Sequence, residues 1–262
     1  MDIKEFISLL DRMIYERRKM TSPLYQVILS GNATQRLLQG FVINRWPIKN
    51  FWSRNILGIA SRIDDYSLRL ALVENIYEEE TGFITKSSRH LQSFVNFGEA
   101  VGLTQQEIEI APVLSETQAV IEHNVNACNN SNVHFSAGVA SVLLLMEGQP
   151  SIVNETDQSM ESIMKNVYQL DKRGYDFFTH HASSNSSHSH VSDLEDDHAT
   201  VARDILRKYC KTEDLQKQAI DFLAQAIELR HQHFDMILRN YYDPHEAPFR
   251  SPVNQEEKLL RV

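Results

Sequence analysis

The chain has 262 residues, of which 42% are hydrophobic and 23% are charged, with a formal net charge of −9 and an isoelectric point near 5.7. This length and hydrophobic content can bury one substantial core, and nothing in the composition requires a second core. The acidic balance, with no clustered basic stripe, excludes a nucleic-acid-binding surface of the usual kind. We expect one helical domain over residues 1–243 and a proline-containing tail over residues 244–262.

Apolar residues recur at intervals of three and four through most of the chain, whereas alternating strand patterns bounded by turn pairs are missing. The pattern predicts an all-α, single-domain bundle of about seven to nine helices. In chain order the expected helices are 1–20, one starting at Ser22-Pro23, one after the Gly31 turn, 40–63 split or bent at Pro47, 66–80, 86–101, 104–128 interrupted near Pro112, 133–147, 151–170, 172–208 and 213–241.

The N-terminal segment predicts an amphipathic helix of mixed charge and shows no export signal. The apolar run over residues 139–146 is too short to cross a bilayer and indicates a buried helix. The two cysteines, Cys128 and Cys210, fit a reducing compartment and exclude a disulfide scaffold. We therefore expect a cytoplasmic protein with no membrane partner.

Histidines concentrate near the C-terminal side of the chain. Five of the eleven fall between residues 180 and 198, namely His180, His181, His188, His190 and His198. A lone helical histidine is usually a surface or satisfied core residue. Here, however, no glycine or proline interrupts the helix, and residues seven apart share a face, so His181, His188 and Glu195 align with apolar positions. Burying these groups together requires a compensating charge, and iron, manganese or zinc would supply it.

Two further acidic positions precede this cluster. Glu80 ends a run of three glutamates at a helix C-terminus, which the helix dipole disfavours, although a solvated helix end is the simpler interpretation. A helix break separates Glu80 from His90 and would let both reach one centre. Glu147 closes an apolar helix and is either exposed at its end or drawn inward.

Glu80, His90, Glu147, His181 and His188 would come from four helices and could form one oxygen-and-nitrogen site. Carboxylate-bridged di-iron sites are built from glutamates and histidines on facing helices. A catalytic zinc needs only three protein ligands and would leave several of these groups unexplained. The set therefore favours a two-metal centre.

Four segments, 22–46, 75–103, 141–150 and 177–206, carry a resemblance in their order and spacing to the haem-oxygenase-like di-metal oxidases. These are relatives of the chlamydial death-domain-associated protein and include pyrroloquinoline-quinone synthase, with TenA as a more distant fold relative. The family pattern has a glutamate and a histidine around a helix break, a later glutamate, and then His-x3-Asp-x2-His. Glu80, His90 and Glu147 match the first three positions.

The last motif of the resemblance has two alignments. Counted forward from Phe177 it falls on His181, Asn185 and His188, with asparagine in place of aspartate. Counted back from the following helix it falls on Val191, Glu195 and His198. The resemblance thus implies His181 and His188 as metal ligands, with Glu195 and His198 as the substitute carboxylate and imidazole.

By the same resemblance, the cofactors are two Fe(II) ions, with manganese or a mixed pair as alternatives, and dioxygen is the co-substrate. The implied activity is oxidation, through a peroxo species, of a small organic substrate, with an amino acid or amine in a biosynthetic pathway favoured. The branch that converts a tryptophan-type amino acid into a nitrile, aetokthonotoxin nitrile synthase, is nearest in chemistry. Five aromatic residues either wall the substrate pocket or belong to the core: Trp46, Trp52, Phe94, Phe177 and Phe178.

Three other functions stay open at this point. One is a metal-independent oxidase similar to pyrroloquinoline-quinone synthase, in which histidines act as acids and bases. Another is a TenA-like hydrolase, which would need Cys128 or Cys210 as its nucleophile. The last is a non-enzymatic interaction protein with an acidic surface. Fold relatives often pair, so a homodimer is among the expected assemblies.

Overall fold

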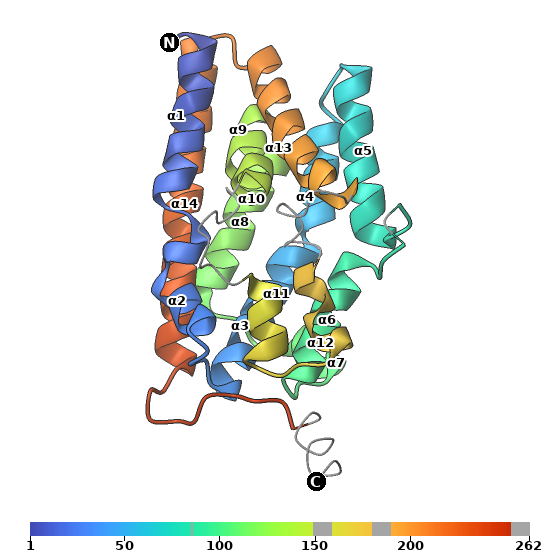
Figure 1. Cartoon of the computed structure of the whole chain (residues 1–262). Helices are drawn as coiled ribbons and strands as arrows, with labels where there is room; N and C mark the ends of the chain where they lie inside the picture. Colours follow the sequence, from blue (N-terminus) through green and yellow to red (C-terminus); the bar gives the residue numbers. More distant parts are fainter. Residues whose placement is uncertain (85, 149–158, 180–189, 253–262) are drawn as a thin grey trace.

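The computed structural model of the protein describes residues 1–84, 86–148, 159–179 and 190–252, with the backbone alone over residues 190–198. Within these ranges every regular element is helical (Figure 1), which confirms the all-α fold. The elements are α1 (Ile3–Glu16), the 3-10 helix η1 (Lys19–Thr21), α2 (Pro23–Leu29), α3 (Gln35–Asn50), α4 (Trp52–Ala60), α5 (Tyr66–Thr81), α6 (His90–Ala100), α7 (Gln105–Ile110), α8 (Ser115–Asn129), α9 (Ser136–Gly138), the π-helix η2 (Val139–Leu144), α10 (Leu145–Glu147), α11 (Met160–Asn166), α12 (Lys172–Thr179), α13 (His190–Tyr209) and α14 (Glu213–Tyr241).

Local capping sets most of these boundaries. Ser22 accepts a hydrogen bond from the Tyr25 amide at the start of α2, and Thr212 does the same for Leu215 at the start of α14. Gly82, at φ 63°, ends α5 in the left-handed conformation that glycine tolerates. Pro47 lies inside α3, which ends at Asn50. The structure therefore divides several expected helices into shorter elements.

The core consists of two apolar clusters stacked along the bundle. One cluster is built mainly by α1, α4, α5, η2, α13 and the first half of α14, and the other by α2, α3, α6, α11, α12 and the second half of α14. Helix α14 has 29 residues and runs the length of the molecule beside α1 and α2 (Figure 1). This single helix therefore joins both clusters.

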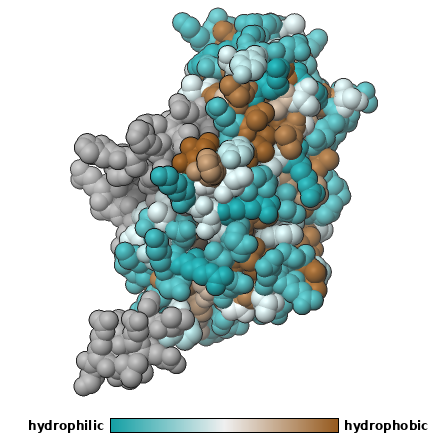
Figure 2. Space-filling model, turned by 90° about the vertical axis from the view of Figure 1, so that its right-hand side faces the viewer, coloured by the Kyte–Doolittle hydropathy of each residue, from teal (hydrophilic) through white to brown (hydrophobic). Residues whose placement is uncertain are grey.

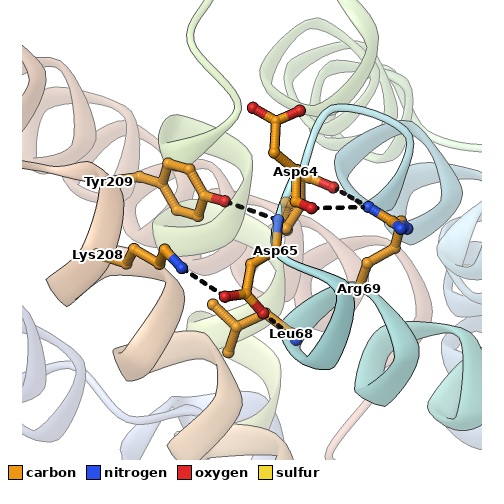
Figure 3. A network of polar contacts seen from close by, with 7 residues as sticks. Asp64, Asp65, Leu68, Arg69, Lys208 and Tyr209 are labelled. Atoms are coloured by element: carbon orange, nitrogen blue, oxygen red, sulfur yellow. Dashed lines mark hydrogen bonds and ion pairs between the residues drawn. The ribbon is translucent and has the colours of Figure 1, made fainter.

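A polar network fixes the end of α13 against the start of α5 (Figure 3). Asp65 caps α5 by accepting from the Leu68 amide at 2.9 Å and forms an ion pair with Lys208, which lowers the pKa of the Asp65 carboxyl. The Asp65 amide donates to the Tyr209 hydroxyl at 3.2 Å. Arg69 donates to the carbonyls of Ile63 and Asp64. The last turn of α13 is thus held at the loop between α4 and α5.

Residues 244–252 follow α14 without helical structure but pack on the bundle. The Phe249 amide donates to the Ala33 carbonyl at 2.9 Å, and the Ser251 amide donates to the Tyr168 carbonyl at 2.9 Å. The Phe249 side chain is buried. The first part of the expected tail is therefore tied to the segments just before α3 and just after α11, and the domain boundary at residue 243 stays a prediction.

Helix α5 carries apolar side chains on its outer surface, because Tyr66, Leu70, Val73 and Tyr77 are all exposed. Figure 2 shows this side of the molecule, with apolar side chains gathered in its upper half. In the described part of the chain, every helix is too short or too polar to traverse a lipid bilayer.

Histidine 233 makes the stability of the fold depend on pH. Its ring is buried in α14. The Thr117 hydroxyl donates its proton to Asn44 Oδ1 at 2.8 Å. In the 3.2 Å contact between His233 Nδ1 and Thr117 Oγ1, the histidine nitrogen must therefore be the donor. Burial lowers the pKa of His233 to about 3. The folded histidine therefore stays neutral while the unfolded one takes a proton near pH 6.5.

This depressed pKa contributes stability above about pH 6.5 that is lost as the pH falls toward the folded value. In the wild type, His233 makes the free energy of unfolding fall as the pH is lowered from about 6 to 4. We predict that this fall is less steep in H233Q, and that the two slopes differ by up to about 1.4 kcal/mol per pH unit. Urea denaturation at several pH values measures the slope, with the exposed His245→Gln as control. An unchanged slope in H233Q would contradict the assignment.

Candidate functional site

A pocket that is partly open to solvent lies in the middle of the bundle, at the junction of the two apolar clusters. Its polar lining is Arg45, Lys49, Asn55, Glu79, His90, His123, Asn124, Ser141, Glu147 and Arg230. Its apolar lining is Ile48, Trp52, Val120, Val142, Leu145, Met146, Ala226 and Leu229. The helices α3, α4, α5, α6, α8, α10, α14 and η2 all contribute, as expected for a site in a helical bundle.

On α5 the glutamate that lines the pocket is Glu79, whereas Glu80 does not reach it. Leu72, Asn75 and Ile76 are buried, and Glu79 continues their face at the spacing of three, four and seven residues. Glu80 is rotated away by about 100° and forms a surface ion pair with Arg89, with Oε2 2.7 Å from Nη2. The register of α5 therefore selects the neighbouring carboxylate, one residue before the expected one.

His90 is the first residue of α6, and it meets Glu79 across the break between α5 and α6. Its Nδ1 atom is 3.8 Å from Glu79 Oε2, and the two side chains are 17% and 28% exposed. The His90 ring packs on Phe177 of α12, with ring centroids 4.9 Å apart. The helix break thus brings His90 beside Glu79 instead of the expected Glu80, and Phe177 packs on the imidazole.

Glu147 lines the same pocket from α10 and is partly buried. The preceding π-helix, Val139–Leu144, is wider than an α-helix and changes the register of the residues that follow it. Of the two alternatives left open by the sequence, an exposed helix end and a carboxylate drawn inward, the structure has the second.

The remaining expected ligands cannot be placed beside this set. His181 and His188 lie outside the described residues, and Glu195 and His198 fall where the structure describes only the backbone of α13. Within the described side chains no three of the histidine, cysteine, aspartate and glutamate residues stand close enough to hold a metal ion. The described part of the pocket supplies Glu79, His90 and Glu147, an oxygen-and-nitrogen donor set of the kind that iron and manganese prefer.

The aromatic residues considered from sequence divide between pocket and core. Trp52 lines the pocket, while Phe94, Phe177 and Phe178 are buried in the second cluster and Trp46 packs against it. Core packing is therefore the main role of four of the five.

Cationic side chains in the pocket were not found from the sequence, because each lies singly within a helical pattern. Lys49 holds its ammonium group 4.4 Å from the centre of the Phe177 ring and 5.3 Å from that of Phe94. Removal from water, followed by repulsion from Arg45, lowers the pKa of Lys49 to about 7, although Glu79 and Glu147 act in the opposite direction. The lysine thus stands between an arginine and the two carboxylates.

His123 of α8 is the other lining residue that no sequence signal marked. It is 7% exposed, and desolvation lowers the pKa of its imidazole. Its Nε2 atom is buried without a hydrogen-bond partner among the described residues. A buried ring nitrogen in this position is available to a bound molecule.

Comparisons with known proteins identify the family of the chain. A family described as iron-containing redox enzyme matches residues 39–231. The chain is 22% identical over 184 residues to a 4-aminobenzoate synthase of Chlamydia muridarum, which is 70% of this chain and 74% of the relative. A 4-aminobenzoate synthase of Chlamydia trachomatis serovar D is also 22% identical over 184 residues, 70% of this chain and 76% of the relative. The region matched by the family, residues 39–231, contains Glu79, His90 and Glu147.

Two solved structures share the fold. One is a domain of unknown function with a heme oxygenase-like fold from Shewanella denitrificans, with a TM-score of 0.62 and 14% identity over 94% of this chain and 99% of that chain. The other is a TenA homolog from Pseudomonas syringae pv. tomato, with a TM-score of 0.64 and 13% identity over 90% of this chain and 91% of that chain. The haem-oxygenase-like fold expected from the sequence is therefore confirmed.

The two cysteines are placed where burial opposes ionisation of their thiols. Both are fully buried, and burial raises the pKa of Cys128 to about 12 and also raises that of Cys210. Because the thiolate is the reactive form, we predict that native protein reacts with a thiol reagent at least about 100-fold more slowly than urea-denatured protein. A spectrophotometric thiol assay measures both rates. Comparable rates would show an accessible, ionised thiol and would revive cysteine-based hydrolysis.

Proposed function

Because the chain belongs to the family of iron-containing redox enzymes, we propose that it is an oxygen-dependent iron enzyme that oxidises a small organic substrate in the central pocket. The observation that carries this proposal is the convergence of Glu79, His90 and Glu147, from α5, α6 and α10, on one pocket with an apolar wall. These groups are far apart in sequence, and they are the oxygen and imidazole donors that suit iron.

In this proposal Glu79, His90 and Glu147 hold iron, and His181, His188, Glu195 and His198 remain the expected sources of the other ligands. Two Fe(II) ions are proposed, with manganese or a mixed pair as the alternative. Iron bound here would supply the electrons that reduce dioxygen. The Phe177 ring packs against the His90 ring and fixes its orientation. Contacts of this kind orient a metal-binding side chain before the metal arrives.

The other lining residues exclude water and hold the substrate. Val142, Leu145 and Leu229 give the pocket an apolar wall, which lowers the local dielectric and strengthens polar contacts with a bound molecule. An amino acid or amine is the proposed substrate. The names of the chlamydial relatives, 4-aminobenzoate synthases, support small aromatic chemistry that involves an amine and a carboxylate. Conversion of a tryptophan-type amino acid to a nitrile is the narrower proposal within this class.

We predict that anaerobic protein binds Fe(II) to two equivalents and consumes dioxygen when exposed to it. Replacing Glu79 by Gln or Glu147 by Gln removes the negative charge of a metal ligand, so we expect the iron affinity to fall by at least about 10-fold. Loss of a residue that only supports a metal ligand already lowers metal affinity by about that factor. Glu80→Gln is the matched control on the adjacent position of α5, and its iron affinity stays at the wild-type value. Competition with a chromogenic iron chelator measures the affinities.

Several outcomes would contradict this assignment. Loss of iron in E80Q but not in E79Q would place the metal on the outer face of α5. Full oxidase activity in protein stripped of metal would favour the metal-independent reaction of the pyrroloquinoline-quinone synthase type. Hydrolytic activity without oxygen uptake would favour the TenA-like alternative.

A further inference from the structure

We propose that Arg45 and Arg230 form a carboxylate-binding subsite at the end of the pocket away from Glu79 and His90, and that this subsite selects substrates bearing a carboxylate. The inference rests on the proposed function only in assigning the bound molecule as substrate. It concerns residues that play no part in the proposed metal site, so binding can be tested without metal.

Arg45 of α3 is a buried cation without a counter-charge in the described protein. Its side chain lines the pocket, and the whole residue is 7% exposed. Its guanidinium carbon lies 5.6 Å from the centre of the Phe234 ring, and its Nε atom is buried with no hydrogen-bond partner among the described residues. Burial lowers the pKa of Arg45, with only Tyr25 acting in the opposite direction.

Arg230 faces the same end of the pocket from α14, one turn before Phe234. It is 6% exposed, and one terminal nitrogen donates to the Arg17 carbonyl at 2.6 Å. Its Nε is also buried without a partner in the described part of the chain. Burial and then repulsion from Arg45 lower the pKa of Arg230 to about 10. Two guanidinium groups thus line one pocket, close enough to repel each other.

Buried charges are normally paired, and one that is unpaired destabilises the folded chain. An anion bound between Arg45 and Arg230 would satisfy both donors and cancel the repulsion. Guanidinium groups bind carboxylates and phosphates with two parallel hydrogen bonds. The described lining has three cationic side chains, Arg45, Lys49 and Arg230, against the carboxylates Glu79 and Glu147. The same lining includes the apolar side chains of Ile48, Leu145 and Leu229, which suit an organic carboxylate better than inorganic phosphate.

The subsite also fixes the direction in which a substrate lies. Arg45 and Lys49 are four residues apart on α3, which is about one helical turn or roughly 6 Å along the axis. Of the three lining cations, Lys49 is the one that interacts with Glu79 and Glu147, so it lies toward the carboxylate end of the pocket. A substrate anchored at Arg45 and Arg230 would extend past Ile48 and Leu145 and present its far end to Glu79, His90 and Glu147.

The test uses full-length protein freed of metal with a chelator, and calorimetric titration with 3-phenylpropionate and its neutral isostere 3-phenylpropanamide. We expect the acid to bind at least about 10-fold more tightly than the amide, the difference that charge-assisted hydrogen bonds typically provide. In R45Q and R230Q the preference for the acid should disappear while binding of the amide changes little. Arg36→Gln, an exposed arginine on the same helix that bonds to the Asn240 carbonyl, is the control and should keep the preference.

Equal binding of acid and amide to the wild type would overturn the proposal, as would an unchanged preference in R45Q and R230Q. Tighter binding of inorganic phosphate than of the acid would overturn the carboxylate assignment. Should a glutamine variant fail to fold, R45K and R230K retain the charge but lose the two-pronged geometry, and an undiminished preference in both would count against the subsite. Absence of iron binding would defeat the proposed function without changing these results.

Discussion

The structure depends on burying charged side chains between two apolar clusters. Arg45 and Lys49 sit beside the second cluster, where Phe234 lies under Arg45 and Phe94 and Phe177 lie under Lys49. Taking such groups out of water is costly unless opposite charges compensate them. The pocket places two carboxylates beside Lys49 and leaves the arginines facing an open space. Buried charges and an open pocket occur together between the two apolar clusters, where a purely structural core would contain apolar side chains. This combination indicates a ligand-binding site.

Two departures from regular α-helix geometry assemble the site. The left-handed Gly82 ends α5 and allows the chain to return with His90 beside Glu79, although these residues are eleven positions apart. The π-helix before α10 changes the direction of Glu147, and π-helical turns often occur at functional sites. Neither feature involves a loop over the pocket. The three donors are therefore carried by helices that pack into the core, rather than by a flexible loop.

Sequence patterns predicted the fold well because the helix boundaries depend on residues close to them in the sequence. Thr212 and the Tyr241 end of α14 follow capping and apolar periodicity, and the helix has the expected bounds. Glu80 was predicted from the spacing of a family motif. The buried face of α5, formed by Leu72, Asn75 and Ile76, indicates instead that Glu79 points toward the pocket. Arg45, His123 and Arg230 had no local signal, because a single polar residue in a helix shows its surroundings only after distant helices pack against it.

We propose that carboxylates and an imidazole from α5, α6 and α10 hold iron in one pocket. Crystals grown anaerobically with Fe(II), and diffraction data collected at the iron absorption edge, test it most directly. We expect anomalous density within coordination distance of Glu79, His90 and Glu147, with Glu80 still paired to Arg89. Iron density at Glu80, or a fully loaded protein with no density in the pocket, would contradict it.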